Sequence, residues 1–338
     1  MTELAKPRAG RLRFHMPGHK GKPLPYPLDI SCDLTEIPGT DDLYAPSGAI
    51  ARAQSAAARS ARAGHTIMLT NGSTAGVLTM VMYAAPDGGK LLLPRNAHRS
   101  AANACKLAGI QPVFIDPGET LDAMRRHPDA RAVFVTSPDY YGIVTPLAPI
   151  AEEARRLGMR LLVDQAHGAH WNWWDSPVRA GLSGADMWVQ SAHKTLPAPG
   201  QTAWLHMSAA EDPDLARAIL ARTQTSSPSY LFMTALDCAR DWMDGFGADA
   251  LARLKDMIPS RWPDGIVDPR AGSGTAFDPT RIVLDVTGRG LTGFEAQRRL
   301  AALGVDIELA DERRIVLIAT VADEPDDFGG LYYAISQI

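Results

Sequence analysis

Six short apolar runs, each five or six residues long, recur between residues 66 and 191. Runs of this length bounded by turn residues predict buried strands. Helix-like segments such as STAGVLTMVMYA, HRSAANACKLAG and PIAEEARRLG separate several of them. We therefore predict an α/β domain with a largely parallel sheet, right-handed crossovers and helices on both faces. The runs are TIMLT (66–70), KLLLP (90–94), QPVFID (111–116), AVFVTS (132–137), RLLVDQ (160–165) and MWVQS (187–191).

The sequence on either side of these runs has a different character. The N-terminal stretch is rich in Pro, Gly and Asp, which predicts loops and turns. An Ala/Arg-rich helix is expected from Ala49 to about Ala63, and a long helix around 229–257. RIVLDVT, a helix, VDIELA and RIVLIAT then suggest a small βαββ unit after residue 280. We expect a loop-rich segment over 1–48, a large domain over 49–245 and a small C-terminal α+β domain over 246–338.

Composition narrows the classes of partner. The 338 residues are 46% hydrophobic and 21% charged, enough to bury a large core, and the formal charge of -4 is spread along the chain. We therefore expect a small-molecule partner, with neither nucleic acid nor a membrane surface. Three widely spaced cysteines, no apolar leader and no membrane-length apolar stretch favour free thiols and the cytoplasm.

Lys194 directly follows the apolar run MWVQ, in Ser191-Ala192-His193-Lys194-Thr195. A lysine at the end of a buried strand can be desolvated, which lowers its pKa and makes the amine a usable nucleophile toward an aldehyde. Taken alone, a surface lysine after a strand explains the pattern better. Asp164 alters that balance because it ends the run RLLVD in the adjoining β unit. There it could pair with the protonated ring nitrogen of pyridoxal 5′-phosphate (PLP), or it could serve as a helix cap or turn residue.

Two further features fit the same cofactor. NGSTAG (71–76) follows a predicted strand and opens a helix, so backbone N–H groups with the hydroxyls of Ser73 and Thr74 form a ready phosphate site. Helix capping alone also favours Ser or Thr at such positions. His98 follows the run KLLLP, where its imidazole could stack on a pyridine ring, and a solvated loop histidine is an equally good interpretation.

Eight longer phrases follow one another along the chain: FHMPGHKG (14–21), DLTEIPGTDDLYAPSGAI (33–50), NGSTAG (71–76), PRNAHRS (94–100), SPDYYG (137–142), VDQAHGAH (163–170), SAHKTLPAPGQTAWLH (191–206) and QTSSPSY (224–230). They resemble the ornithine/lysine/arginine decarboxylases in the same order over roughly residues 14–240, and LTGFEAQRRLAALGVDIELAD (291–311) resembles the start of that family's small domain. The resemblance implies the aspartate-aminotransferase-like fold, known as fold type I, with PLP as cofactor. It also implies decarboxylation of lysine, arginine or ornithine to an amine and CO₂.

The same resemblance implies roles for individual residues. Lys194 would form the imine with the cofactor, Asp164 would lie opposite the ring nitrogen, and His98 would stack on the ring. Either Lys194 or His193 could return a proton to Cα. The remaining implied cofactor contacts are Ser73, Thr74, Ser191 and His193 at the phosphate, and His167 near the cofactor.

The substrate contacts are less directly indicated. The family works as a dimer with the site at the subunit interface, so segments 33–44 and 224–230 are candidates to reach a neighbour's site. The candidate substrate residues are Glu36, Asp41, Asp42 and Tyr141. Turn and capping roles explain the three carboxylates nearly as well.

Some features depart from the family pattern. Family decarboxylases continue into a longer C-terminal region with a Pro-rich YPPG-type stretch, which is not found up to Ile338, and Thr40 and Tyr44 stand where Leu and His are usual. These departures affect the substrate more than the cofactor, because the expected PLP residues all precede position 231. An aminotransferase, another Cα lyase and a non-catalytic PLP-binding homologue therefore remain alternatives.

A nicotinamide-dependent oxidoreductase is the alternative from another class. GRGLTG (288–293) fits GxGxxG between a strand and a helix, with Glu308 and Asp311 at a suitable distance for a ribose. Too little sequence follows it for the rest of a dinucleotide-binding sheet. His15 and His19 could suggest a metal site, but the Pro-Gly between them prevents helical i,i+4 geometry, so we expect no metal.

Overall fold

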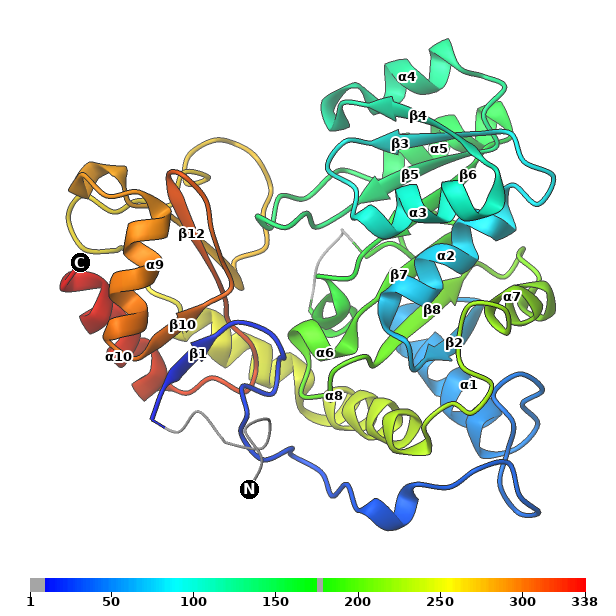
Figure 1. Ribbon diagram of the computed structural model, residues 1–338, viewed down its shortest axis with the longest axis horizontal. Helices are drawn as coiled ribbons and strands as arrows, with labels where there is room; N and C mark the ends of the chain where they lie inside the picture. The colour runs from blue at the N-terminus through cyan, green and yellow to red at the C-terminus, as the bar shows by residue number, and fades with distance from the viewer. Residues whose placement is uncertain (1–9, 175–178) are drawn as a thin grey trace.

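The computed structural model describes residues 10–174 and 179–338, which form a large domain and a small one (Figure 1). The described residues of the large domain build a seven-stranded sheet in which β8 is antiparallel to both of its neighbours and the other pairings are parallel. The order is β2 (His65–Leu69), β8 (Ala203–Met207), β7 (Met187–Gln190), β6 (Arg160–Asp164), β5 (Ala132–Thr136), β3 (Lys90–Pro94) and β4 (Gln111–Ile115).

The six predicted strands are confirmed to within one residue at each end. Their continuous apolar character has a simple cause, because both faces of the sheet are covered. Along β3, Leu91 and Leu93 join one buried cluster and Leu92 joins another. Alternate side chains of a strand point to opposite faces, so both faces need apolar residues. Strand β8 was not among the predicted strands.

Helices cover the two faces of this sheet (Figure 1). One face packs against α2 (Gly72–Ala84), α3 (Arg99–Ala108) and α7 (Pro213–Leu220). The other packs against α4 (Thr120–Arg126) and α5 (Ala148–Leu157), while α1 (Ala49–Ala61) lies along α8 (Tyr230–Met257). Shorter elements are η3 (Pro117–Glu119), η4 (Ala169–Trp173) and α6 (Ala192–Thr195).

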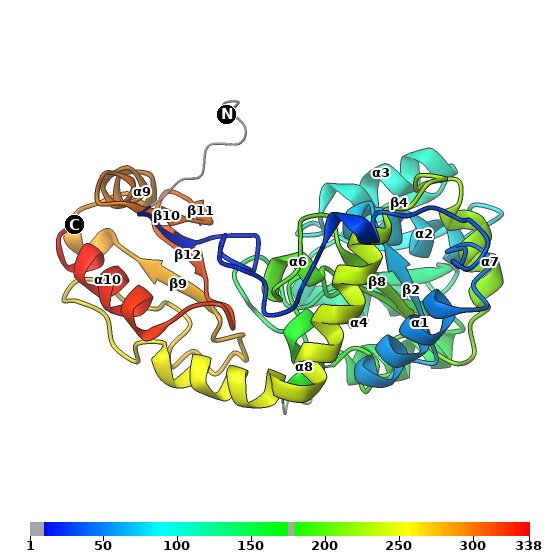
Figure 2. The same cartoon turned by 90° about the horizontal axis from the view of Figure 1, so that it is seen from below.

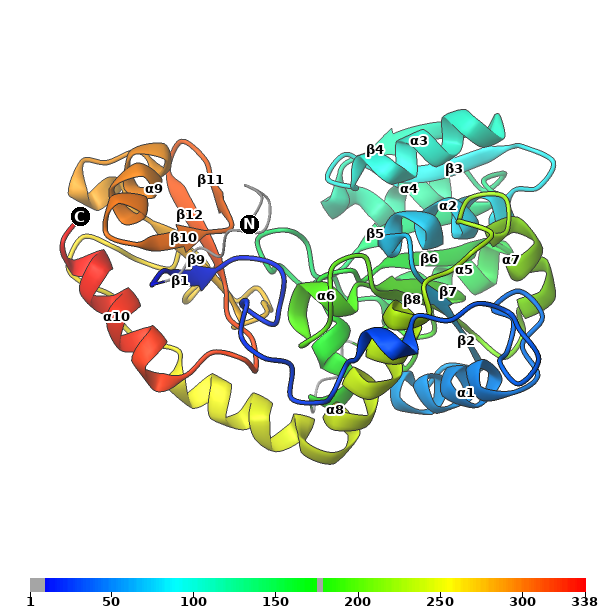
Figure 3. The same ribbon diagram turned by 60° about the horizontal axis from the view of Figure 1, so that its bottom comes forward.

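The small domain combines the end of the chain with its beginning. An antiparallel sheet runs in the order β11 (Leu309–Ala310), β12 (Arg314–Ile318) and β9 (Arg281–Asp285). The predicted loop segment supplies β1 (Leu12–Phe14), which pairs in parallel with β10 (Val305–Ile307). Figure 3 shows this segment continuing from β1 toward α1 of the large domain. The other elements are η2 (Ile30–Cys32), η5 (Thr287–Arg289), α9 (Gly293–Ala302) and α10 (Pro325–Ser336).

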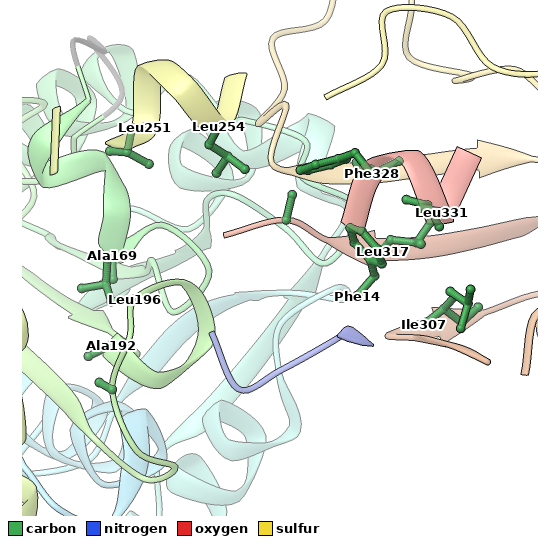
Figure 4. Close-up of a cluster of buried hydrophobic side chains, with 14 of the residues drawn as sticks. Phe14, Ala169, Ala192, Leu196, Leu251, Leu254, Ile307, Leu317, Phe328 and Leu331 are labelled. Carbon is green, nitrogen blue, oxygen red and sulfur yellow. The ribbon is translucent and has the colours of Figure 1, made fainter. Parts of the chain in front are cut away.

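Helix α8 and one apolar cluster join the two domains. Figure 2 shows α8 passing from the large domain to the small one, so the expected boundary at residues 245 and 246 falls inside a helix. Our domain limits stay a prediction. The cluster in Figure 4 includes Leu196 beside α6, Leu254 of α8 and Leu317 of β12. The packing therefore holds the small domain against the edge of the large sheet at which β6 and β7 end.

GRGLTG has a structural role that differs from dinucleotide binding. Thr292 accepts a hydrogen bond from the Glu295 N–H, and the Glu295 carboxylate accepts one from the Thr292 N–H, which caps α9. A Cβ added at Gly293 would lie 2.2 Å from the Arg314 carbonyl oxygen, so the helix start packs directly on the first residue of β12. The adjoining sheet is antiparallel rather than the parallel sheet that such a motif needs. Across residues 10–174 and 179–338, no helix is both long and apolar enough to cross a membrane.

Candidate active site

A cavity of about 670 Å³ lies at the carboxyl ends of β5, β6 and β7. Ligands bind at this edge in parallel α/β sheets. Thr136 ends β5, Asp164 ends β6, and Lys194 lies in α6 just after β7. The predicted cofactor residues that line the cavity are Ser73, Thr74, His98, Asp164, His167, His193 and Lys194. Ser191 joins them indirectly, since its hydroxyl donates to Ser73 Oγ at 2.9 Å.

The start of α2 forms one end of the cavity. Gly72 adopts φ +72°, a left-handed conformation that suits glycine, and turns the chain into the helix. Asn71 makes no side-chain capping bond among the described residues, and the Gly72 N–H donates to the Gln201 carbonyl at 2.8 Å, which leaves the N–H groups after Gly72 for a ligand. A Cβ at Gly76 would lie 2.5 Å from Val189 Cγ1, and this close approach places the helix start beside the end of β7.

Asp164 is held at the end of β6 with little exposure to water. Its Oδ1 accepts a hydrogen bond from the Ala166 N–H at 3.0 Å, and the residue is 5% exposed. The turn role considered from the sequence is therefore present. Asp164 also lines the cavity, because only one of its two carboxylate oxygens makes the turn hydrogen bond.

His98 both caps a helix and lines the cavity. Its Nδ1 accepts from the Ser100 N–H at 3.3 Å, which makes it the N-cap of α3. Burial lowers the pKa of His98, with Asp164 acting in the opposite direction. On the other side, Nδ1 of His193 donates to the Thr202 carbonyl at 2.9 Å, and burial likewise lowers the pKa of His193.

Lys194 contacts a histidine, and that histidine contacts an arginine. Its Nζ lies 3.1 Å from Nε2 of His167, and Nδ1 of that ring contacts Nη2 of Arg281. Burial lowers the pKa of Lys194, Asp164 acts against that effect, and Arg281 adds to it. Nη1 of Arg281 is buried with no hydrogen-bond partner in the described part of the chain. An unpaired buried donor of this kind fits an anionic or oxygen-bearing ligand.

Three residues of this region were missed by the sequence analysis, namely Arg281, Tyr140 and Glu308. Tyr140 lines the cavity, and its hydroxyl donates to Glu308. The guanidinium carbon of Arg281 lies 5.8 Å from the centroid of the Tyr140 ring. Glu308 also accepts from the Met16 N–H at 3.0 Å, so the carboxylate considered for a ribose instead bonds residues beside this cavity. A charged residue directly before an apolar run, as Arg281 stands before IVL, was the available signal.

Among the described residues, the four candidate substrate contacts lie outside the cavity lining of their own chain. Tyr141 donates to Asp311 Oδ2 at 2.9 Å, while its neighbour Tyr140 faces the cavity. Asp41 accepts from backbone N–H groups around the start of α1. Glu36 is exposed and Asp42 accepts from the Tyr44 N–H at 2.8 Å. A role for the acidic residues in a neighbouring subunit stays a prediction.

Comparison with known proteins decides the family. The family described as Orn/Lys/Arg decarboxylase, major domain, matches residues 6–258. The chain belongs to this family. An uncharacterized Bacillus subtilis protein, YaaO, is 35% identical over 90% of the chain and 70% of its own length. An arginine decarboxylase of Bacillus subtilis is 33% identical over 97% of the chain and 74% of its own length.

Solved structures show the fold of this family member. Lysine decarboxylase A from Pseudomonas aeruginosa superposes with a TM-score of 0.78 at 17% identity, covering 90% of the chain and 53% of that enzyme. The chain thus spans about half the length of that enzyme. An alanine–glyoxylate aminotransferase from Nostoc sp. has a TM-score of 0.72 at 15% identity, covering 100% of the chain and 97% of that protein. The predicted aspartate-aminotransferase-like fold is confirmed.

Proposed function

We propose that this protein is a PLP-dependent decarboxylase that converts a basic amino acid to the corresponding amine and CO₂, with Lys194 as the residue that attaches the cofactor. One observation carries the proposal. A single cavity unites a partly buried lysine, a buried carboxylate and a helix N-terminus at the carboxyl edge of the sheet. The family membership and the arginine decarboxylase relatives support the reaction and the class of substrate.

The residues fit the chemical needs of PLP. An aldehyde requires an amine in its neutral form, and burial of Lys194 favours that form. A phosphate requires donors, which the start of α2 supplies together with the hydroxyls of Ser73 and Thr74. A pyridinium nitrogen requires an anion, and Asp164 lines the same cavity. The volume of about 670 Å³ also lies within the usual range for small-molecule sites.

When bound, PLP supplies an electron sink for the electrons released as the bond between Cα and the carboxylate breaks. Asp164 would stabilise positive charge at the ring nitrogen, and the imidazole of His98, whose pKa is lowered by burial, lines the same cavity. His193 uses Nδ1–H to hold the Thr202 carbonyl, so Nε2 is the atom free to exchange a proton. Nζ of Lys194 or Nε2 of His193, after taking up the proton that the substrate ammonium loses, would then deliver it to Cα in place of the departing CO₂.

We also propose that the protein acts in the cytoplasm as a homodimer or larger homo-oligomer with its site at the subunit interface. Segment 30–37 supports this arrangement. Ile30 is 74% exposed and Ile37 is 52% exposed in the single chain, and Ile37 directly follows the candidate substrate residue Glu36. A neighbouring subunit that covered these apolar side chains would bring acidic residues of the segment toward a site.

The decisive assay is release of CO₂ from carboxyl-labelled arginine, lysine and ornithine by the purified protein supplied with PLP. The proposal predicts release from at least one of the three, and none from a Lys194→Ala variant. An oxo acid formed only with an added keto-acid acceptor, without CO₂, would instead establish the aminotransferase alternative. Absence of both products from a protein that still binds PLP would establish a non-catalytic homologue.

A further inference from the structure

Lys194, His167 and Arg281 form an unbroken chain of nitrogen contacts that links the two domains. Lys194 lies in α6 and His167 follows β6, both in the large domain, whereas Arg281 opens β9 of the small domain. Nζ of Lys194 lies 3.1 Å from Nε2 of His167, and Nη2 of Arg281 contacts Nδ1. His167 is 6% exposed and Arg281 is 2% exposed, so bulk water is a poor substitute for either contact.

Donor and acceptor rules assign the protons along this chain. A guanidinium offers only N–H donors and keeps its charge in proteins, so Nδ1 of His167 must accept from Arg281. A neutral imidazole that accepts through one nitrogen carries its proton on the other. The proton is therefore on Nε2 and is directed at Nζ of Lys194.

This assignment determines the charge state of the lysine. Nζ must accept from Nε2–H, which requires the lone pair of a neutral amine. An ammonium has no lone pair, so its N–H groups would face the Nε2–H of His167 and neither nitrogen could accept. A doubly protonated His167 would set donor against donor at the Arg281 contact, so neither alternative fits the geometry.

We propose that Arg281 is a positioning residue that fixes the Nε2–H tautomer of His167 and, through that ring, holds Lys194 as a neutral amine. The inference deepens the proposed function and rests on it for its biological meaning, because Lys194 is the proposed point of cofactor attachment. It also gives the small domain a part in preparing the lysine, since Arg281 is the first residue of β9.

The other charged and titratable groups around the chain act in both directions. Burial lowers the pKa of Lys194, Asp164 and Glu308 act against that effect, and Arg281 reinforces it. Burial also places the pKa of His167 well below its ordinary value, and the positive charges of Lys194 and Arg281 add to the lowering, as do His98 and His193. These effects all favour a neutral His167, which the tautomer assignment requires.

The first test observes the histidine directly, in the protein without cofactor. Nitrogen-15 NMR of histidine-labelled protein reports which ring nitrogen carries the proton, and a His167→Gln variant identifies the signal. We expect wild type to show a neutral His167 ring protonated at Nε2. We expect Arg281→Met to yield a mixture of tautomers, and Arg281→Lys, which keeps a charged donor, to retain the Nε2–H form.

Arg270→Met is the matched control. Arg270 is also a buried small-domain arginine, 6% exposed, but it pairs with Asp268 and donates to the Tyr141 carbonyl. The control should therefore leave the His167 signal unchanged. A wild-type ring protonated at Nδ1 would overturn the proposal, even if Arg281→Met failed to fold.

The second test asks whether Arg281 acts through His167. The rate at which acetic anhydride labels Lys194 in the cofactor-free protein, followed against pH by mass spectrometry, reports the neutral fraction of the amine. Arg281→Met should raise the apparent pKa of the Lys194 amine by about one unit. The neutral fraction of the amine near neutral pH then falls, so labelling slows about tenfold. In a His167→Ala background only the charge of Arg281 still acts on the lysine, so the same substitution should slow labelling by less than about threefold.

An equally large effect of Arg281→Met in the His167→Ala background would overturn the proposal, because it would mean that the arginine acts by its charge alone. Both tests are made without PLP. Failure of Lys194 to attach the cofactor would therefore contradict the proposed function while leaving the tautomer result unaffected.

Discussion

Nζ of Lys194 lies 3.1 Å from Nε2 of His167, a ring whose other nitrogen contacts a small-domain arginine. The lysine therefore meets a hydrogen-bond donor rather than only a carboxylate partner. Burial lowers the pKa of Lys194, and the negative charges of Asp164 and Glu308 act against that lowering. The site thus combines groups that favour each protonation state of the lysine, as expected where an amine must both react and exchange protons.

Asp164→Asn tests the carboxylate in the cavity. The amide oxygen can still accept from the Ala166 N–H, so the turn after β6 should survive while the charge is lost. We expect CO₂ release to fall by at least about a hundredfold, the lower range for loss of one electrostatic contact to a transition state. Steady-state assays at saturating PLP measure this. Asp186→Asn is the control, because Asp186 likewise accepts a backbone N–H, from Leu161 at 2.7 Å, but lies outside the cavity lining. Equal losses in the two variants would contradict the assigned role.

Gly76→Ala tests the close packing that positions the start of α2. The added Cβ would lie 2.5 Å from Val189 Cγ1 and 2.7 Å from Leu69 Cδ1, so the helix must shift away from the sheet. Overpacking of this kind should lower the free energy of unfolding by about 1–3 kcal/mol and weaken PLP binding. Denaturant titration and cofactor titration measure the two effects.

Gly245→Ala supplies the comparison for that variant. Gly245 lies within α8, and a Cβ there would meet no atom within 4 Å among the described residues. Alanine should therefore stabilise the protein by about 0.5–1 kcal/mol. A Gly76→Ala variant as stable as Gly245→Ala, with unaltered PLP affinity, would contradict the packing account.

Asp41→Ala separates a structural role from a substrate role. The carboxylate accepts five backbone N–H groups, those of Asp42, Ser47, Gly48, Ile50 and Ala51. Loss of this cap should lower stability by about 1–2 kcal/mol and leave KM for the amino acid nearly unchanged. Thermal unfolding and kinetics check both parts. A large rise in KM with an unchanged melting temperature would instead mean that Asp41 contacts substrate in a neighbouring subunit.

Lys20→Met tests the buried ion pair that ties the N-terminal segment to the small domain. Nζ of Lys20 lies 3.8 Å from Asp323 Oδ2, with side chains 2% and 3% exposed, and donates to the Ile318 carbonyl at 2.6 Å. Removing the lysine alone leaves a buried carboxylate unpaired and should cost about 3–5 kcal/mol. Lys20→Met with Asp323→Asn should recover part of that loss in denaturant titrations. Equal stability of the single and double variants would show that the pair is not coupled.

The large-domain strands could be predicted because each is a short apolar run between turn residues, buried on both faces. Strand β8 shows where that signal fails. AWLHM contains His206, which is buried only because Thr66 and Gln190 bond its ring at 2.7 and 3.0 Å. Those partners come from neighbouring strands and are invisible in a local pattern. The pairing of β1 with β10 was missed for the same reason, since the partners are separated by nearly the whole chain.

The cofactor residues of the large domain were predictable because each follows a strand whose end faces the same sheet edge. Arg281 and Glu308 were not, because they enter the site from another domain. Arg281 stands 114 positions from His167 in the sequence, and only the packing of the small domain brings the two together. Tyr140 and Tyr141 are adjacent in one turn, and the local sequence does not determine which ring enters the cavity.

The most direct test of the account is to reduce the purified PLP-loaded protein with borohydride and map the modified residue by mass spectrometry. The account predicts loss of the visible absorption band and a single pyridoxyl adduct on Lys194, absent from Lys194→Ala. An adduct on a different lysine, or a protein that gains no adduct under saturating PLP, would contradict the central claim that Lys194 holds the cofactor.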